Sequence, residues 1–491
     1  MRDSGERSIF EEDLLTMLPY PSWLNTGDNT WQLTAATLVG LMSIPGLAVL
    51  YGGVVQRRWA VNSALMAFYG FAVVLLIWVL WGFKMSFGSP INIGSLPQFL
   101  GIPGPSLDHV AEQARANIPL LSGIGAMPQF RFPQASLIYF QFVFAAITPL
   151  LFLGSVVGRI NFKAWMILVP VWSTVIYSVD AFSIWGGGWL AQSGAVDYSG
   201  GYVIHLSAGV SGFVAAAVIG PRLARDRKEP GPNNLMMTMA GAGLLWMGWN
   251  GFNGGDPFFA GVDASSAVLN TNIAAATALL TWLSIDMVVA GKPSLVGAVN
   301  GMITGLVAIT PAAGFVNGTG AIAIGVVASA IPWFTMNRVA IFRRVDDALG
   351  VIHTHGIAGL IGGLMVGVVA DPQMMEYLGN GKTPGFSVTS LLGGGGAHQL
   401  QVQAQAALFV IAFSAVGTFA ILKLIALVVP LRMPDAMLET GDMVIHGEEV
   451  GVPIPALSPE PDLGAPLLPG AIRGGALMAS STNVTPPLSR T

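Results

Sequence analysis

The chain has 491 residues, of which only 10% are Asp, Glu, Lys or Arg, against about 25% in soluble domains. Hydrophobic residues make up 53% of the sequence, and its mean hydropathy is +0.65. So few charged residues cannot form the surfaces of several soluble domains, and the composition favours one polytopic membrane protein. The net charge of −4 gives no reason to expect a nucleic-acid partner. Because the sequence contains no Cys, disulfides, thiolate metal sites and a Cys nucleophile are excluded.

Apolar stretches long enough to cross a bilayer, which takes about 20 residues, recur along the chain. We predict an all-α fold with eleven membrane spans, at 31–54, 60–87, 134–157, 164–187, 201–219, 234–253, 264–288, 294–314, 319–341, 350–370 and 403–430. The membrane domain is therefore 31–430, after an extracytoplasmic lead-in over 1–30 without a cleavable signal peptide. We expect 431–451 to be a cytoplasmic regulatory segment, and the Pro/Ser/Gly-rich residues 452–491 to be disordered.

The basic residues of the connecting loops predict the orientation of the chain. One set of loops carries 13 Lys and Arg residues, and the alternate set carries six. Because cytoplasmic loops are enriched in Lys and Arg, the N-terminus is expected outside and the C-terminus inside. An odd number of spans agrees with this orientation. No organelle-targeting segment is evident, so we expect a bacterial inner membrane.

Two of the predicted spans carry the same histidine motif. Span five reads GGYVIHLSAGVSGF and span ten reads GVIHTHGIAGLIGG, so H-x-x-A-G-x-x-G begins at both His205 and His355. Two successive groups of five spans must lie in opposite orientations, which predicts an inverted five-helix repeat followed by a final helix. The small residues in the motif make a flat face for a neighbouring helix.

The paired histidines predict a functional site near the pseudo-two-fold axis. Ionisable side chains in a membrane are costly and usually functional, and here one occurs at related positions in both halves. The alternative is two hydrogen-bonded histidines at a helix interface. His353, two residues before His355, points to another helix face, and we expect it beside the pore or in its vestibule.

Several further sequence blocks carry a resemblance to a known family. The chain resembles the ammonium transporter family (Amt, methylammonium permease and Rhesus proteins), and within it the bacterial Amt type, over roughly 28–450. The blocks are GLAVLYGGVVQRR, FQFVFAAITPLLFLGSVVGRINF, WGGGWLAQSGAVDYSGGYVIHLSAG, GWNGFNGGD, GKPSLVGA, ITPAAGF, VDDALGVIHTHGIAG and GDMVIHGEEVG.

The resemblance implies a homotrimer with one narrow hydrophobic pore in each subunit, and no enzymatic activity, cofactor or metal. It assigns Phe144 and Trp185 to an outer recruitment site, and Phe144 and Phe252 to a gate. It makes His205 and His355 the twin histidines of the pore and Asp197 a structural carboxylate. It also places Trp249 and Thr310 near the pore.

These residue types suit the transport of ammonium. An ion entering lipid loses its hydration at a large cost, and aromatic faces attract cations by about 0.5–2 kcal/mol each. Crossing as neutral ammonia avoids most of that cost, and imidazole can accept or donate the released proton. We therefore expect ammonia to be conducted with or without a separately relayed proton. Asp197, at a predicted helix start, can also accept backbone N–H groups.

Two positions depart from the family pattern. Asp256 stands where bacterial relatives often have Ser, and it could either strengthen cation recruitment or cap the short loop 254–263. Gly350 stands where several relatives have an acidic residue, and His353 replaces a small residue found in some of them. Both changes concern the inner vestibule.

Other functions remain open beside a transporter. An ammonium sensor with the same fold and little flux is the main alternative, although sensors usually carry a large appended signalling domain. A Rhesus-like gas channel is disfavoured by the Trp185 and Phe144 pair, and a His-ligated metalloenzyme by the lack of a carboxylate partner motif. The basic loop 222–234 could dock a trimeric PII-type signal protein, or could be an ordinary cytoplasmic loop.

Overall fold

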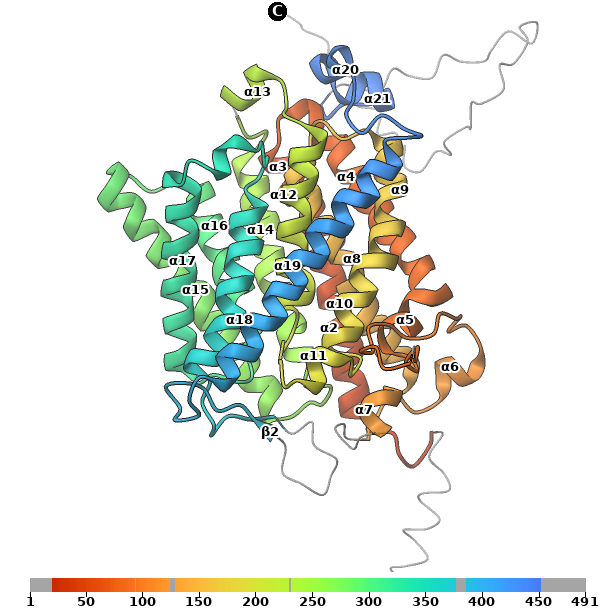
Figure 1. Cartoon of the computed structure of the whole chain (residues 1–491). Coiled ribbons are helices and arrows are strands. Elements are labelled where there is room, and N and C mark those ends of the chain that lie inside the picture. Colours follow the sequence, from red (N-terminus) through yellow and green to blue (C-terminus); the bar gives the residue numbers. More distant parts are fainter. Residues whose placement is uncertain (1–19, 93, 124–128, 229–230, 377–385, 452–491) are drawn as a thin grey trace, which may run out of the picture. The chain divides into compact units, whose positions relative to one another are not determined.

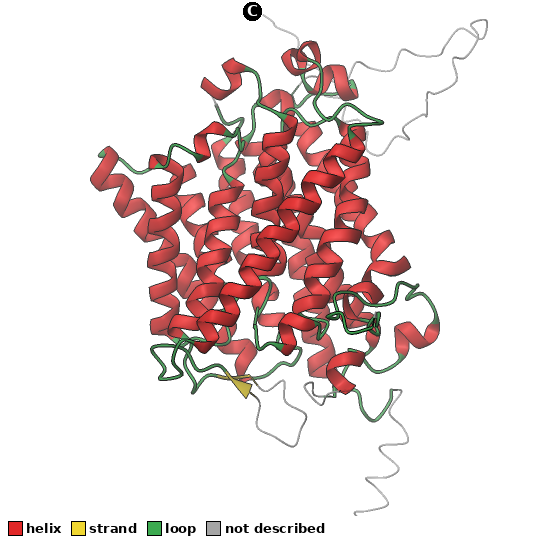
Figure 2. Ribbon diagram, viewed as in Figure 1, coloured by secondary structure: helices red, strands yellow, loops and turns green. Residues whose placement is uncertain are grey.

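The structure is a computed structural model, and it describes residues 20–92, 94–123, 129–228, 231–376 and 386–451. Within these residues the chain is helical except for loops and one antiparallel pair of two-residue strands, β1 (Met375–Glu376) and β2 (Phe386–Ser387). Long helices run side by side through the unit that ends at Val450 (Figures 1 and 2). The predicted all-α fold is confirmed. The disordered tail predicted for 452–491 and most of the lead-in lie outside the described residues.

The first half of the chain contains five helical runs, several of them interrupted by π-helical turns. The runs are α2 (Thr26–Leu41) with η1 (Met42–Gly46) and α3 (Leu47–Val54); η2 (Arg57–Trp59) with α4 (Ala60–Ile77), η3 (Trp78–Gly82) and α5 (Phe83–Phe87); α8 (Gln134–Val156); α9 (Phe162–Trp172) with η4 (Ser173–Tyr177), α10 (Ser178–Ile184) and α11 (Trp189–Gln192); and η5 (Gly201–Leu206) with α12 (Ser207–Ile219).

The second half repeats this arrangement and adds a final long helix. Its runs are α14 (Leu235–Gly255), α15 (Val262–Ala290), α16 (Leu295–Ile309), α17 (Gly318–Arg338), and η7 (Ile352–Ile357) with α18 (Ala358–Val369), followed by α19 (His398–Ile425). Short helices lie in the connections and the tail: α6 (His109–Gln113), α7 (Pro119–Gly123), α13 (Ala224–Lys228), η6 (Phe342–Arg344), α20 (Asp435–Thr440) and α21 (Asp442–His446).

Every predicted span corresponds to one of these helical runs. Nine runs in the described residues are long and apolar enough to cross a membrane. The other two are α14, which ends in the polar sequence NGFNGG, and the shorter apolar α16. The first helix begins at Thr26, earlier than predicted, because the Asn25 side chain accepts a hydrogen bond from the Asp28 backbone N–H (3.0 Å).

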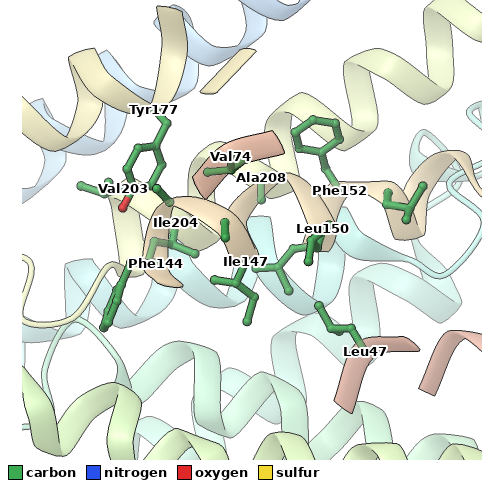
Figure 3. Packing of buried hydrophobic residues seen from close by; sticks show 14 of the residues in the cluster. Leu47, Val74, Phe144, Ile147, Leu150, Phe152, Tyr177, Val203, Ile204 and Ala208 are labelled. Carbon is green, nitrogen blue, oxygen red and sulfur yellow. The ribbon is translucent and has the colours of Figure 1, made fainter. Parts of the chain in front are cut away.

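Helix α8 is the most buried of the candidate spans and positions the candidate site. Figure 3 shows Phe144 and Ile147 of this helix near Ile204 of η5. Within α8, Phe144 and Ile147 are fully buried. This packing holds the α8 aromatic side chains beside the π-helical turn that carries His205.

The two histidine motifs pack reciprocally. His205 lies in η5 and His355 in η7, and both are π-helical turns, which often occur at functional sites. A Cβ atom added to Gly209 would lie 2.2 Å from the Gly356 backbone nitrogen, and one on Gly359 would lie 2.5 Å from the Gly201 carbonyl oxygen. The glycine four residues after each His therefore touches the motif of the other half.

A second pair of glycines shows the same symmetry. A Cβ on Gly212 would meet the Ser155 side chain of α8 at 2.4 Å, and one on Gly362 would meet the Ala308 carbonyl of α16 at 2.1 Å. Helices α8 and α16 are the third helical runs of their respective halves. Corresponding glycines thus pack on corresponding helices, as the predicted inverted repeat requires.

The two ends of the helical unit differ in charge. We call the end that holds α13, α20 and α21 (Figure 1) the arginine-rich end, since Arg58, Arg222 and Arg432 lie there. There the Asp442 carboxylate accepts hydrogen bonds from Val61 N (2.8 Å) and Asn62 N (3.0 Å). The segment that carries α20 and α21 therefore contacts the start of α4.

The motif glycines provide a test of the packing. Gly359→Ala should destabilise the protein by about 1–3 kcal/mol, because its Cβ would collide with the backbone of Gly201. Gly243→Ala is the matched control, since a Cβ at that exposed helical position meets nothing within 4 Å. Thermal unfolding of the purified variants would measure both effects. Equal melting temperatures for the two variants would contradict the proposed close approach.

Candidate functional site

A row of five rings crosses the region between α8, α14 and the two π-helical turns. It begins with Trp185 and ends with His355. The centroid separations along the row are 6.2 Å for Trp185–Phe144, 4.4 Å for Phe144–Phe252, 5.8 Å for Phe252–His205 and 5.4 Å for His205–His355. The structure thus brings together the five residues predicted for recruitment, gate and twin histidines.

The first ring, Trp185, ends α10 and is half-buried. Its indole N–H donates to the Asp197 carbonyl oxygen at 2.7 Å, which holds the ring at 85° to Phe144. The faces of the two rings are therefore set at right angles at the end of the row farther from the histidines.

Asp197 organises the segment that leads into the first π-helical turn. Its Oδ2 accepts hydrogen bonds from Tyr202 N (2.9 Å) and Val203 N (3.0 Å), and its Oδ1 accepts one from Gly200 N (3.2 Å). The carboxylate is 5% exposed. A carboxylate at a helix start satisfies free N–H groups and complements the helix dipole. The same aspartate, through its carbonyl, orients Trp185.

Phe144 and Phe252 close the row between Trp185 and the histidines. Their centroids are 4.4 Å apart with the planes tilted by 35°, and both side chains are fully buried. At this separation no space remains between the rings for a hydrated ion. A particle can pass only after a ring moves and only after losing its water shell.

The two histidines meet through their Nδ1 atoms, which are 3.3 Å apart. Two such nitrogens form a hydrogen bond only when one carries a proton and the other a lone pair. With both rings neutral, one Nε2 then carries a proton and the other does not. The pair therefore presents a donor and an acceptor to its surroundings. His205 Nε2 is buried with no hydrogen-bond partner among the described residues, a costly state of about 1–3 kcal/mol.

Trp249 and Thr310 lie beside His205 and are joined by a hydrogen bond. The Trp249 ring stacks on His205 with centroids 5.3 Å apart and an angle of 20°. Its indole N–H donates to Thr310 Oγ1 at 2.9 Å, and that hydroxyl donates to the Leu306 carbonyl at 2.7 Å. These hydrogen bonds satisfy the indole N–H and leave the apolar face of the Trp249 ring against the His205 imidazole.

A cavity of about 460 Å³ joins the histidine pair to the arginine-rich end. Its lining runs from Gln56 and Arg222 at the loops to Trp249, His353 and His355. His355 retains 8% exposure, whereas His205 has none. The row of rings is therefore open to the cavity on the His355 side and closed by the phenylalanine pair on the other side.

An ion pair holds the rim of this cavity. Arg222 donates two side-chain hydrogen bonds to Asp346, at 2.7 and 3.0 Å. Burial alone would raise the pKa of Asp346, but the hydrogen bonds and the charge of Arg222 outweigh burial and hold that pKa below its ordinary value. Asp346 is therefore ionised at neutral pH, and Arg222 is engaged in the rim.

Asp256 lies beside the phenylalanine pair, at the C-terminal end of α14. It is 6% exposed, and its Oδ2 forms a short hydrogen bond with the Ser199 hydroxyl. The same hydroxyl lies 2.9 Å from the Phe252 carbonyl oxygen. Attraction of a cation requires the ionised carboxylate, in which case the single Ser199 proton is donated to Asp256 Oδ2.

His353 lies in the cavity wall. Its Nδ1 is 2.9 Å from Thr335 Oγ1, and its ring meets the edge of Phe342 at a centroid distance of 4.9 Å. Gly350, the other departure from the family pattern, has a left-handed backbone with φ of +70°, which glycine adopts at little cost. A Cβ there would press on Met336 at 2.9 Å.

Sequence reasoning did not identify Ser199 and Thr335 as part of the site. Each is a single hydroxyl residue that contacts a candidate residue from a different segment, Asp256 and His353 respectively. Neither belongs to a repeated or charged pattern, so the sequence carried no signal for either. Among the described residues, no group of three or more His, Asp or Glu is placed to hold a metal ion.

Comparison with known proteins places this geometry in a family. The model of the Ammonium Transporter Family matches residues 30–450. The chain is 51% identical over 435 residues to Ammonium transporter 2 member 1 of Oryza sativa subsp. japonica, covering 87% of both chains. It is 51% identical over 434 residues to Ammonium transporter 2 of Arabidopsis thaliana, covering 87% of this chain and 89% of the relative.

A solved structure agrees with these sequence matches. The crystal structure of Saccharomyces cerevisiae Mep2 superposes with a TM-score of 0.72 and 28% sequence identity, over 83% of this chain and 89% of Mep2. The predicted family is confirmed, but the bacterial Amt type is wrong, because the matching relatives at about half identity are plant proteins. The sequence blocks that carry the resemblance did not separate the two types.

Removing the charge of Asp197 tests its structural role. Asp197→Asn should lower the free energy of unfolding by about 2 kcal/mol, because an amide turns a donor toward backbone N–H groups that now bind a carboxylate. Asp435→Asn is the matched control, as that side chain is 67% exposed and paired only with Arg432. Thermal unfolding in detergent would compare the two. Unfolding of Asp197→Asn at the wild-type temperature would contradict the role.

Proposed function

The chain belongs to the ammonium transporter family, and we propose that it moves ammonium across a membrane through the row of rings described above. Ammonium would be recruited at Trp185 and Phe144, cross the Phe144–Phe252 gate, and continue as ammonia along His205 and His355. The observation that carries the proposal is the Nδ1–Nδ1 histidine pair with an unpartnered, buried His205 Nε2.

Recruitment follows from the aromatic geometry. Trp185 is half-buried and stands perpendicular to Phe144, so a cation between them would meet one ring face and one ring edge. Cation–π attraction of about 2 kcal/mol or more at a desolvated site would offset part of the lost hydration. The gate behind it, sealed at 4.4 Å, would then favour the species with the smallest desolvation cost, which is neutral ammonia.

The histidine pair suits ammonia because ammonia is both a donor and an acceptor. One Nε2–H of the pair can donate to the ammonia lone pair, and the other Nε2 can accept from an ammonia N–H. Such binding would satisfy the His205 Nε2 that no described residue satisfies. An imidazole pair can also take up the proton that ammonium releases. We propose that the pair holds ammonia and passes on that proton.

The cavity would be the exit, and the arginine-rich end would face the cytoplasm. Loops enriched in Lys and Arg remain on the cytoplasmic side of membrane proteins, and the cavity opens among Arg222 and its neighbours. This orientation places the C-terminal segment inside and Trp185 outside. The relatives at about half identity are plant proteins, which does not favour the bacterial inner membrane predicted from the sequence.

Assembly and regulation are proposed on the resemblance alone. The unit is expected to form a homotrimer, and residues 431–451 are expected to regulate it from the cytoplasmic face. A PII-type partner would have to bind the exposed Arg227 and Lys228 of α13, because Arg225 already donates to the Glu439 carbonyl (3.0 Å). The sensor alternative differs from the transporter in flux, which the experiment on the histidine pair measures.

The contribution of Asp256 can be tested at the recruitment step. Asp256→Ser should raise the methylammonium concentration for half-maximal uptake by about threefold, because a nearby carboxylate attracts a cation across a partly screened mouth. Asp435→Ser, at the arginine-rich end, is the control for loss of one carboxylate. An unchanged half-maximal concentration for Asp256→Ser would remove Asp256 from recruitment.

The histidine pair is tested by current measurements on proteoliposomes attached to a solid-supported membrane. An ammonium pulse should evoke current from the wild type, and His355→Ala or His205→Ala should lower that current by at least about tenfold, because the proton acceptor is lost. His398→Ala, at an exposed position, should leave it unchanged. A silent wild type would support the sensor alternative, and full current from both pair variants would contradict the pore assignment.

A further inference from the structure

The inner cavity contains a third imidazole that the proposed function does not use. His353 and His355 both line the cavity, although residues two apart in a helix usually face different directions. His353 is 6% exposed and His355 is 8% exposed. The two rings therefore open into the same space, on the arginine-rich side of the histidine pair.

Thr335 defines which nitrogen of His353 faces the cavity. The Thr335 hydroxyl lies 3.1 Å from the Pro332 carbonyl oxygen and 2.9 Å from His353 Nδ1. A hydroxyl has one proton. Both contacts are hydrogen bonds only if that proton goes to the carbonyl and the oxygen accepts from an Nδ1–H. The neutral ring then carries its proton on Nδ1, and Nε2 presents a lone pair.

That lone pair faces the cavity. His353 Nε2 forms no hydrogen bond with the described residues, and it is not among their fully buried polar atoms without a partner. Phe342 packs edge-on against the ring (4.9 Å, 73°) and fixes its direction. A Cβ at position 350 would be in ordinary contact with this ring, 3.8 Å from His353 Cδ2.

The cavity lining holds further titratable groups, of which Arg343 is a guanidinium that cannot act as a base at neutral pH. Asp226 is paired with Arg58, and Tyr51 donates to the Leu150 carbonyl at 2.7 Å. Asp347 accepts from Ile352 N at 2.8 Å through one oxygen, and its other oxygen is buried without a hydrogen-bond partner among the described residues. Among the lining residues, His353 is therefore a base whose Nε2 has no hydrogen-bond partner and faces the space next to His355.

We propose that His353 is the proton acceptor on the exit side of the histidine pair, positioned by Thr335. This inference rests on the proposed function. The proton leaves a ring nitrogen of His355, passes along a water or ammonia molecule in the cavity, and forms an N–H bond at His353 Nε2. The resulting imidazolium keeps its Nδ1–H on Thr335. It then releases the Nε2 proton to ammonia that has left the pore, forming ammonium, or to water.

The test uses the full-length protein in proteoliposomes and ammonium-evoked current. His353→Asn keeps a side-chain N–H for Thr335 but cannot titrate, and should lower the current by at least about tenfold. Thr335→Val keeps the imidazole without its positioning contact, and should give an intermediate current. His109→Asn is the matched control, because that histidine is exposed on α6, and it should conduct like the wild type.

Chemical rescue separates a proton role from a structural one. His353→Ala should lose current and regain at least about half of it in imidazole, a base near neutral pH, and none in pyrazole, which has the same ring size but is a far weaker base. Thermal unfolding would verify that each variant folds, and Thr335→Val serves if a His353 variant does not.

The outcomes distinguish a failure of the His353 role from a failure of the proposed function. Retention of more than about half of the wild-type current by His353→Asn, or equal restoration of His353→Ala by imidazole and pyrazole, would overturn the role of His353 while leaving transport intact. A wild type without ammonium-evoked current would instead reject the proposed function, and the relay with it.

Discussion

One hydrogen bond between two imidazoles is the contact on which the arrangement of this protein depends. His205 and His355 come from different halves of the chain, and their Nδ1 atoms meet at 3.3 Å. They can do so because Gly209 and Gly359 let each π-helical turn touch the other backbone. A side chain at either glycine would separate the halves and break the pair. The symmetry of the fold and the chemistry of the site therefore share one set of small residues.

In the proposed function, the order of the rings follows the changing cost of desolvation along the row. A half-buried tryptophan comes first, where a cation would still keep some of its water. A closed phenylalanine pair follows, and then imidazoles that can hold a neutral molecule through both lone pair and N–H. Beyond His355 the cavity returns to polar groups, with Arg222 and Asp346 as a closed ion pair at the rim. The imidazoles of the row thus lie on the side of the phenylalanine pair away from Trp185.

Much of the fold could be predicted, because membrane spans and repeats leave periodic marks in a sequence. The helical runs match the predicted spans, and the repeated H-x-x-A-G-x-x-G motif pointed to His205 and His355. The contacts of Asp256 with Ser199 and of His353 with Thr335 could not be predicted, since they join distant segments through single hydroxyl groups. Helix starts such as Thr26 depend on one capping side chain, Asn25, which hydropathy does not register.

The most direct test of the central claim is ¹⁵N NMR of the protein labelled at histidine, compared with His355→Ala. The account predicts two neutral rings joined by one Nδ1–H···Nδ1 bond, seen as a protonated and a bare Nδ1 with a coupling between them. That coupling should vanish in the variant, and the remaining His205 should return to an uncoupled tautomer. Two rings both protonated at Nε2 alone, with no coupling between their Nδ1 atoms in the wild type, would contradict the account.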